Sequence, residues 1–147
     1  MVNVIKQKMK YIEKITYQLG YELKGTDYRI EDMGCPHIQP SQMPTGYAAI
    51  YIFIYNGEFL KIGKANAKSN PRFISQHYGL SAPSTLAKSI CKDTEFSSLG
   101  VNQENVKFWM LHNLQRINIY VKADKATTEL IEAILHYAFR PRFEGNL

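Results

Sequence analysis

The sequence predicts an α/β fold: a small three-stranded antiparallel sheet flanked by helices on both sides, with an extra helix at the N-terminus. Residues 48–55 (AAIYIFIY) are apolar on both alternating faces, which is typical of a strand buried on both sides. Asn56-Gly57 follows at once and is the strongest short-range hairpin signal, so residues 58–63 form the partner strand. Residues 116–122 (RINIYVK) alternate between polar and apolar side chains and form the third strand.

The helices are predicted from apolar stripes and from signals at their ends. Residues 4–19 carry an apolar stripe that ends at Gly20, so an amphipathic helix begins the chain. Asn70-Pro71 places a capping residue before a proline at the first helical position, which predicts a helix closing near Gly79. Further helices are predicted over residues 84–91, 102–114 and 126–139, and residues 34–47, with three prolines, form an irregular loop.

The distribution of charge is more informative than the net charge of +5. From Phe59 to Lys92 the chain has six basic residues and no Asp or Glu. Any compact folding of this stretch concentrates positive potential, which attracts polyanions, and nucleic acid first among them. The alternative is a solvated basic surface that has no partner.

Composition excludes several other classes of protein. Hydrophobic residues make up 45% and charged residues 21% of the chain, as in a soluble globular domain. No apolar run approaches the ~20 residues of a membrane span, and the N-terminus has no apolar core of signal-peptide length, so no membrane association is expected. Cys35 and Cys91 are too few for a disulfide framework, which makes a reducing cytoplasm the expected location. Cys35 and His37 lack a second pair of ligands at zinc spacing, and nothing predicts a nucleotide cofactor.

A series of motifs begins inside the strand predicted over residues 48–55 and continues in a recognisable order. It consists of Ala49-Ile50-Tyr51, then Lys61-Ile62-Gly63 ten residues after Tyr51, then Arg72, Glu132 and Arg140-Pro141-Arg142. In these residues the chain resembles the GIY-YIG nuclease superfamily. Members share a three-stranded antiparallel sheet with flanking helices, and they hydrolyse DNA phosphodiester bonds with a single divalent metal ion.

The resemblance also implies a division of the chain. Residues 46–147 correspond to the nuclease domain, and residues 1–45 lie outside it as an N-terminal helical extension and loop. Residues 80–115 are a helical insertion relative to the compact family core.

Arg72 and Glu132 can also be argued from the residues themselves. Arg72 lies in the first turn of its helix, where free backbone N–H groups suit a phosphate, and its fork can bind non-bridging oxygens and stabilise a pentacovalent transition state. The alternative is a surface arginine that covers the core. Glu132 lies in LIEAILHYAF, a helix apolar on nearly every face, so its carboxylate needs either a hard cation such as Mg²⁺ or Mn²⁺ or a salt bridge to a nearby arginine. Glu129 is expected as a surface residue that complements the helix dipole.

Tyr51 and His77 are alternative candidates for directing the attacking water. Tyr51 matches the tyrosine of the first motif, but a phenol titrates well above neutral pH, so it acts as a base only where nearby cations lower its pKa. Lys61 and Arg72 are the cations that could do so. His77 has a more suitable ordinary pKa for a base.

The second motif departs from the family, and the departure bears on the hairpin. Lys61 stands where the family has tyrosine, and Ala49 stands where it has glycine. A plain two-residue turn would put Lys61 on the opposite face of the sheet from Tyr51. We therefore predict an odd-length loop or a bulge near Asn56–Glu58 that brings both side chains to one face. The C-terminal asparagine of the family corresponds at best to Asn146.

The sequence thus predicts a metal-dependent endonuclease that acts on DNA and, by the resemblance, leaves 5′-phosphate and 3′-hydroxyl ends. Tyr51 or His77 directs water, Lys61 and Arg72 stabilise the phosphorane, and Glu132 holds one Mg²⁺ or Mn²⁺ ion. Contacts to the DNA backbone are expected from Lys64, Lys68, Lys88, Arg140 and Arg142. The alternative is a catalytically silent nucleic-acid-binding module on the same scaffold.

Overall fold

The computed structural model describes residues 1–144 and has an α/β architecture, as predicted. In this part of the chain one antiparallel sheet contains four strands in the order β1-β4-β2-β3. The strands are β1 (Tyr28–Gly34), β2 (Ala48–Tyr55), β3 (Glu58–Ala65) and β4 (Gln115–Val121). The last three confirm the predicted strands, whereas β1 corrects the expected number from three to four. Asn146 lies outside the described residues.

β1 is an edge strand that pairs with β4, from Tyr28 opposite Val121 onward. All of its residues are exposed or only partly buried. Arg29, Glu31 and Asp32 interrupt the apolar alternation that would mark a strand in the sequence, because an edge strand needs no continuous buried face. The first 45 residues therefore contribute a strand to the central sheet.

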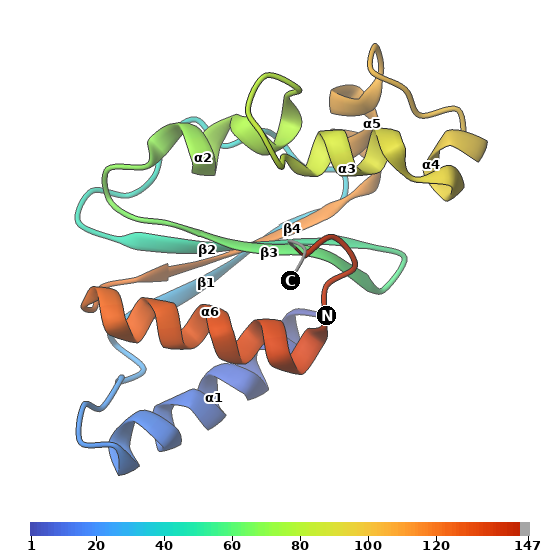
Figure 1. Cartoon of the computed structure of the whole chain (residues 1–147). Coiled ribbons are helices and arrows are strands. Elements are labelled where there is room, and N and C mark those ends of the chain that lie inside the picture. The colour runs from blue at the N-terminus through green and yellow to red at the C-terminus, as the bar shows by residue number, and fades with distance from the viewer. Residues whose placement is uncertain (145–147) are drawn as a thin grey trace.

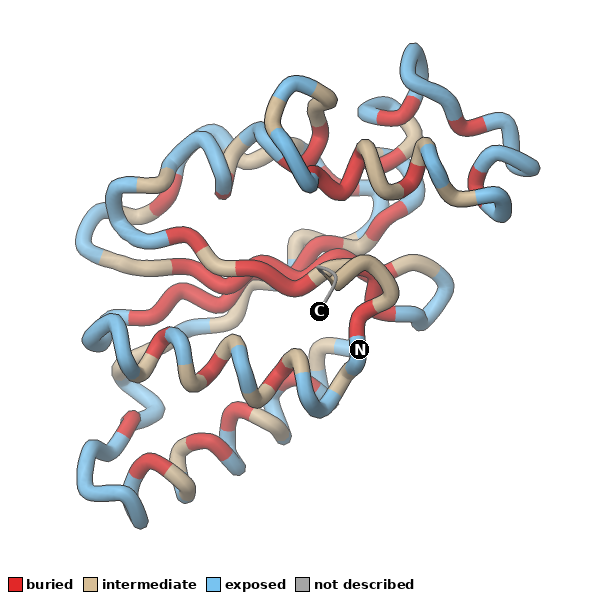
Figure 2. Tube along the Cα trace, in the orientation of Figure 1, coloured by how far each residue is buried: buried red, intermediate tan, exposed pale blue. Residues whose placement is uncertain are grey.

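Helices cover both faces of the sheet, as predicted (Figure 1). One face carries α1 (Val2–Gln18) and α6 (Lys125–Phe139). The other face carries α2 (Asn70–Ile74), the 3₁₀ helix η1 (Gln76–Tyr78), α3 (Leu86–Lys92), α4 (Thr94–Ser98) and α5 (Val106–Asn113). The central strands are buried almost continuously, while buried and exposed residues alternate along the helices (Figure 2).

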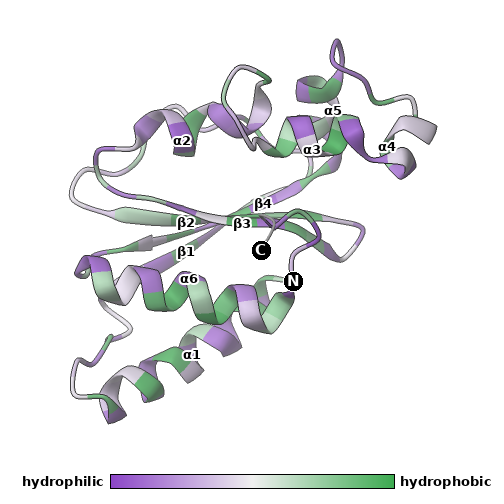
Figure 3. Ribbon diagram, in the orientation of Figure 1, coloured by the Kyte–Doolittle hydropathy of each residue, from purple (hydrophilic) through white to green (hydrophobic). Residues whose placement is uncertain are grey.

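Alternation along β2 divides the apolar core into two layers. Ile50, Ile52 and Ile54 pack in the layer that contains α1 and α6. Tyr51 and Phe53 point the other way and pack in the layer under α2 to α5. Apolar residues recur along α1 and α6 between polar ones, as Figure 3 shows, which suits helices that cover a sheet on one side only.

The helix expected between Asn70 and Gly79 is interrupted. Ser75 leaves the helical conformation, so α2 has five residues and η1 follows as a separate turn. The capping position of α2 is occupied by Ser69 rather than Asn70, and Pro71 lies in the first turn. Because α2 is this short, its backbone dipole is a weaker contribution to anion binding than the sequence implied.

The helix expected from residue 102 begins only at Val106. Asn102 accepts hydrogen bonds from the backbone N–H groups of Glu104 and Asn105 and so stabilises a turn. α4 was not predicted, and it begins where the Asp93 carboxylate accepts from the N–H of Glu95. No helix within residues 1–144 is both long and apolar enough to cross a membrane.

The β2–β3 hairpin has a two-residue turn followed by a bulge. Asn56 and Gly57 both have positive φ, as a tight hairpin turn of this length requires. The register then shifts by one residue at Leu60, so that Phe53 pairs with Lys61 and Tyr51 pairs with Gly63. The predicted bulge is confirmed, two residues beyond the expected segment, and it brings Lys61 to the same face as Tyr51.

The segment after α6 runs along the outer edge of β3. Arg142 and Phe143 donate backbone hydrogen bonds to the carbonyls of Phe59 and Leu60, at 3.0 and 2.8 Å. The Glu144 carboxylate accepts from the N–H of Ile62 at 3.2 Å. These contacts cover the edge of β3 beside its bulge, where an open strand could pair with another chain.

Candidate functional site

A pocket of about 540 Å³ opens at the end of the sheet where β2 begins and β3 ends. Ala48 and Ala65 line it from the ends of β2 and β3, and Ala123 lines it from two residues beyond the end of β4. α6 contributes acidic side chains to this pocket and α2 contributes a basic one. The charged residues that line it are Lys64, Arg72, Lys125, Glu129 and Glu132. The pocket therefore collects side chains from both faces of the sheet at one point.

Gly63 lets Tyr51 reach this end of the sheet. The two residues are paired across β2 and β3, and a methyl group on the Gly63 Cα would overlap the Tyr51 hydroxyl and ring. A side chain at residue 63 would therefore displace the phenol. A glycine inside a strand often marks such a close approach, so the Lys61-Ile62-Gly63 motif carried this signal in the sequence.

The Tyr51 hydroxyl accepts two hydrogen bonds. Arg72 Nε donates to it at 3.1 Å, and His77 Nε2 lies 2.7 Å away. His77 Nδ1 accepts from the backbone N–H of Leu86 at 3.1 Å, which assigns the ring proton to Nε2 and makes His77 a donor to Tyr51. The structure thus brings together three of the predicted catalytic residues.

Burial determines how these groups titrate. It lowers the pKa of His77 to about 3, with further lowering by the charges of Lys61, Arg72 and Arg116. It raises the pKa of Tyr51, while the hydrogen bond from Arg72 acts in the opposite direction. At neutral pH His77 is therefore uncharged and Tyr51 is protonated. Both side chains are buried and neither lines the pocket, so neither reaches water in the pocket directly.

Arg72 is held by one nitrogen and presents the others to the pocket. Its Nε bonds to Tyr51, and within residues 1–144 its terminal nitrogens have no hydrogen bond and no ion pair. A guanidinium fixed in this way can bind two oxygens of one phosphate with its free N–H groups.

The acidic wall of the pocket comes from α6. Glu132 has 23% of its side chain exposed and lies 3.7 Å from Lys64 Nζ, so its ion pair is with a lysine rather than with a nearby arginine. Glu129 lies 3.6 Å from the same ammonium and lines the same pocket, although the sequence suggested only an ordinary surface residue. The spacing of three residues places both carboxylates on one face of the helix, and this was the available signal.

These carboxylates fit a hydrated hard cation rather than a closed metal cage. Within residues 1–144 no cluster of three or more His, Cys, Asp or Glu side chains converges as a metal site. Mg²⁺ is commonly held by one or two carboxylates, several waters and substrate phosphate, and Glu132 with Glu129 can supply the protein share. In the structure, the Lys64 ammonium supplies the positive charge between the two carboxylates.

Four other predicted site residues, Lys61, Lys68, Lys88 and Arg140, are not among the residues that line this pocket. Lys61 lies on the Tyr51 face, where its Nζ donates to the Phe143 carbonyl at 3.2 Å. Lys68 is exposed in the loop before α2. Lys88 lines a separate pocket beside α3, and Arg140 stacks on Tyr137 at the end of α6, with 4.4 Å from the guanidinium carbon to the ring centre.

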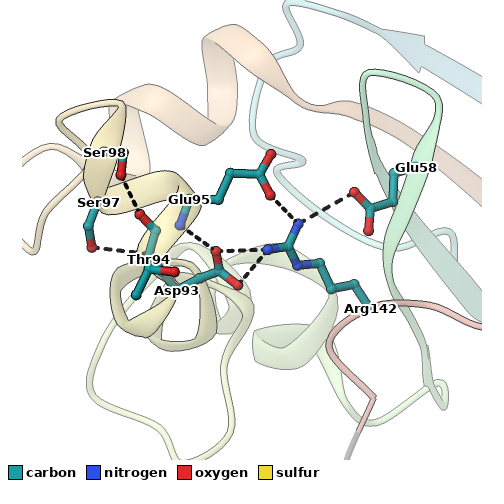
Figure 4. Close-up of polar contacts among 7 residues, drawn as sticks. All are labelled: Glu58, Asp93, Thr94, Glu95, Ser97, Ser98 and Arg142. Carbon is teal, nitrogen blue, oxygen red and sulfur yellow. Dashed lines mark hydrogen bonds and ion pairs between the residues drawn. The ribbon is translucent and has the colours of Figure 1, made fainter.

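Arg142 is occupied by three carboxylates (Figure 4). Its guanidinium lies 2.8 Å from Asp93, 2.6 Å from Glu95 and 3.5 Å from Glu58. These pairs join the C-terminal segment to α4 and to the β2–β3 hairpin. Arg142 therefore links parts of the fold, and a contact between Arg142 and the DNA backbone stays a prediction.

Comparison of the chain with models of known protein families, with curated proteins and with solved structures yields no match. The likeness to GIY-YIG nucleases accordingly rests on the motifs in the sequence alone.

Proposed function

We propose that the chain is a metal-dependent endonuclease that hydrolyses DNA phosphodiester bonds. The observation that carries this proposal is the meeting of Arg72 and Glu132 in one pocket, from opposite faces of the sheet. Phosphoryl transfer needs positive charge on the non-bridging oxygens and a carboxylate that can hold a cation beside them. The pocket combines both.

In this proposal Arg72 binds the scissile phosphate with its free terminal nitrogens and stabilises the charge of the phosphorane. Tyr51 acts through Arg72, because its hydroxyl fixes Nε and so aims the fork at the pocket. His77 supports the same hydroxyl from the other side as a neutral donor. Lys64 adds positive potential at the pocket wall.

Glu132, with Glu129 beside it, would hold one Mg²⁺ or Mn²⁺ ion. When bound, such an ion supplies Lewis-acid stabilisation of phosphate oxygens and lowers the pKa of a bound water. Products with 5′-phosphate and 3′-hydroxyl ends follow from the resemblance. The free thiols of Cys35 and Cys91 agree with a reducing cytoplasm as the proposed location.

A second candidate is a nucleic-acid-binding module that does not cleave. It is favoured by Lys64, whose ammonium already forms ion pairs with both Glu129 and Glu132. In such a module the ion pair would replace the metal, and Arg72 would serve binding alone.

The two candidates are separated by incubating the protein with labelled single-stranded, duplex and branched DNA, in Mg²⁺ or Mn²⁺ and in chelator. The endonuclease gives metal-dependent products that disappear in Glu132→Gln and persist in the matched surface variant Glu104→Gln, whose residue is exposed on the loop before α5. Retarded DNA without products under every condition would support the binding module.

A further inference from the structure

Arg116 on β4 is a buried cation without an acidic partner. Only 1% of the residue is exposed, and no carboxylate within residues 1–144 forms an ion pair with it. Taking a guanidinium out of water is costly, and an apolar side chain of similar size is often as good for stability. A buried arginine at residue 116 therefore suggests that its guanidinium has a role that an apolar side chain could not perform.

The three hydrogen bonds of Arg116 show what it holds. Its terminal nitrogens donate to the carbonyl of Phe73 at 2.7 Å and to the hydroxyl of Tyr78 at 3.0 Å, while Nε donates to Asn118 at 3.0 Å. Phe73 directly follows Arg72, and Tyr78 directly follows His77. One planar group thus fixes the residues next to both donors of the Tyr51 hydroxyl.

The segments that carry those donors need such support. α2 has five residues and η1 has three, so neither contains enough hydrogen bonds of its own to set its position on the sheet. The Arg116 guanidinium carbon also lies 4.7 Å from the centre of the Phe73 ring and 5.8 Å from that of Tyr51. It therefore contacts the phenol and both segments that bond to it.

The hydroxyl of Tyr78 depends on Arg116. His37 Nδ1 lies 2.7 Å from the carbonyl of Leu114 and must donate to it, so His37 Nε2 is the acceptor for the Tyr78 O–H, also at 2.7 Å. The Tyr78 oxygen then accepts from Arg116. The donor and the acceptor of each hydrogen bond in this network are therefore fixed, and the Arg116 guanidinium is the first donor of the series.

We infer that Arg116 is a positioning residue, which acts by holding Arg72 and His77 against the Tyr51 hydroxyl. The inference rests on the proposed function, since it assigns Arg116 a part in that pocket. It requires the planar fork of arginine, because no point charge reaches all three acceptors at once.

The test uses the full chain with Arg116→Met, which removes the fork, and Arg116→Lys, which keeps the charge. For Arg116→Met we expect kcat to fall by about 10²-fold with little change in KM, as for a small misplacement of a binding group. Arg116→Lys should recover part of this loss. In NMR spectra, the Arg72 Nε–H signal and the His77 ring nitrogens should report loss of the bonds to Tyr51.

Arg29→Met is the matched control. Arg29 also lies over an aromatic ring, with 4.3 Å to the centre of Tyr120, but it is exposed on β1 and does not line the pocket. Wild-type kcat, with unmoved Arg72 and His77 signals in the Arg116 variants, would overturn the inference. If Arg116→Met does not fold, Arg116→Lys alone is read by the same criteria.

Failure of the proposed function gives a different result. If the wild-type protein cleaves none of the DNA structures in metal, the nuclease assignment fails. The NMR signals of Arg72 and His77 then still decide whether Arg116 positions them, because that readout needs no activity.

Discussion

The Nε of Arg72 lies 3.1 Å from the hydroxyl of Tyr51, and this bond joins α2 to a residue in the middle of the sheet. Tyr51 is buried, whereas Arg72 lines the pocket. The tyrosine of the first motif thus acts on the pocket through an arginine twenty-one residues later in the chain.

Tyr51→Phe should separate the effect of the hydroxyl, which anchors Arg72, from the effect of the packed ring. The change leaves Arg72 Nε and His77 Nε2 without their acceptor, so we expect a loss of about 1–3 kcal/mol in the free energy of unfolding and a lower kcat. Urea unfolding and cleavage assays measure the two effects. Tyr28→Phe, which loses only a bond to Glu13, is the control and should retain activity. Full activity in Tyr51→Phe would show that Arg72 needs no anchor.

Gly63→Ala should displace the Tyr51 ring. The added methyl group overlaps that ring, and strain of this kind typically costs about 1–3 kcal/mol of stability. We expect lower thermal stability and loss of cleavage. In Gly79→Ala the new methyl group would lie 3.8 Å from the carbonyl oxygen of Gln76, an ordinary van der Waals contact, so the control should resemble the wild type. Equal behaviour of the two variants would contradict the close approach of Tyr51.

Glu132→Gln should abolish cleavage while leaving the fold and the affinity for DNA nearly unchanged. Its ion pair with Lys64 spans 3.7 Å and is partly solvated, so its removal should cost no more than about 1 kcal/mol. The free energy of unfolding and the affinity for DNA in chelator are measured for the wild type and for Glu132→Gln and compared. Retained activity together with a loss of several kcal/mol would identify Glu132 as a structural ion-pair partner instead.

Acidification should destabilise the protein in part through His77. Its folded pKa is lowered from 6.5 to about 3 by burial, so the unfolded chain binds the proton more readily between these values. Stability from this group is complete above pH 6.5 and falls as pH drops toward 3. His77→Gln should therefore flatten the pH dependence of the free energy of unfolding in this window. The same dependence in both proteins would mean that His77 is accessible and protonated when folded.

DNA binding should weaken with salt, with a log–log slope of about −0.9 for each phosphate neutralised on duplex. Lys68→Ala should reduce that slope, because Lys68 is exposed in the loop beside the pocket. Arg142→Ala should leave the slope unchanged and lower the melting temperature, because Arg142 already pairs with Asp93, Glu95 and Glu58. Salt-independent binding would remove nucleic acid as the partner.

Local pattern determined much of the fold. The apolar run of β2, the Asn56-Gly57 turn and the helix α6 each depend on residues close together in the chain, and all three appear in the structure near their predicted bounds. α6 is buried along one side only, at Thr128, Ile131 and Leu135, rather than on nearly every face as its apolar sequence suggested. The requirement that Tyr51 and Lys61 share a face also predicted a bulge, and one is present at Leu60. β1 was not predicted because it is an edge strand with three charged residues and no fully buried residue, so it lacks the apolar alternation that marks a strand in the sequence.

Only the tertiary structure decided what each charged side chain does. Arg142 and Lys64 were both expected to contact DNA, yet Arg142 meets three carboxylates and Lys64 meets Glu129 and Glu132. The role of Arg116 was equally invisible, since its acceptors on Phe73 and Tyr78 lie about forty residues earlier in the chain. Hydrophobic periodicity is a property of neighbouring residues and can be found in the sequence. The environment of a charge depends on groups brought together from distant segments, so it exists only once the chain has folded.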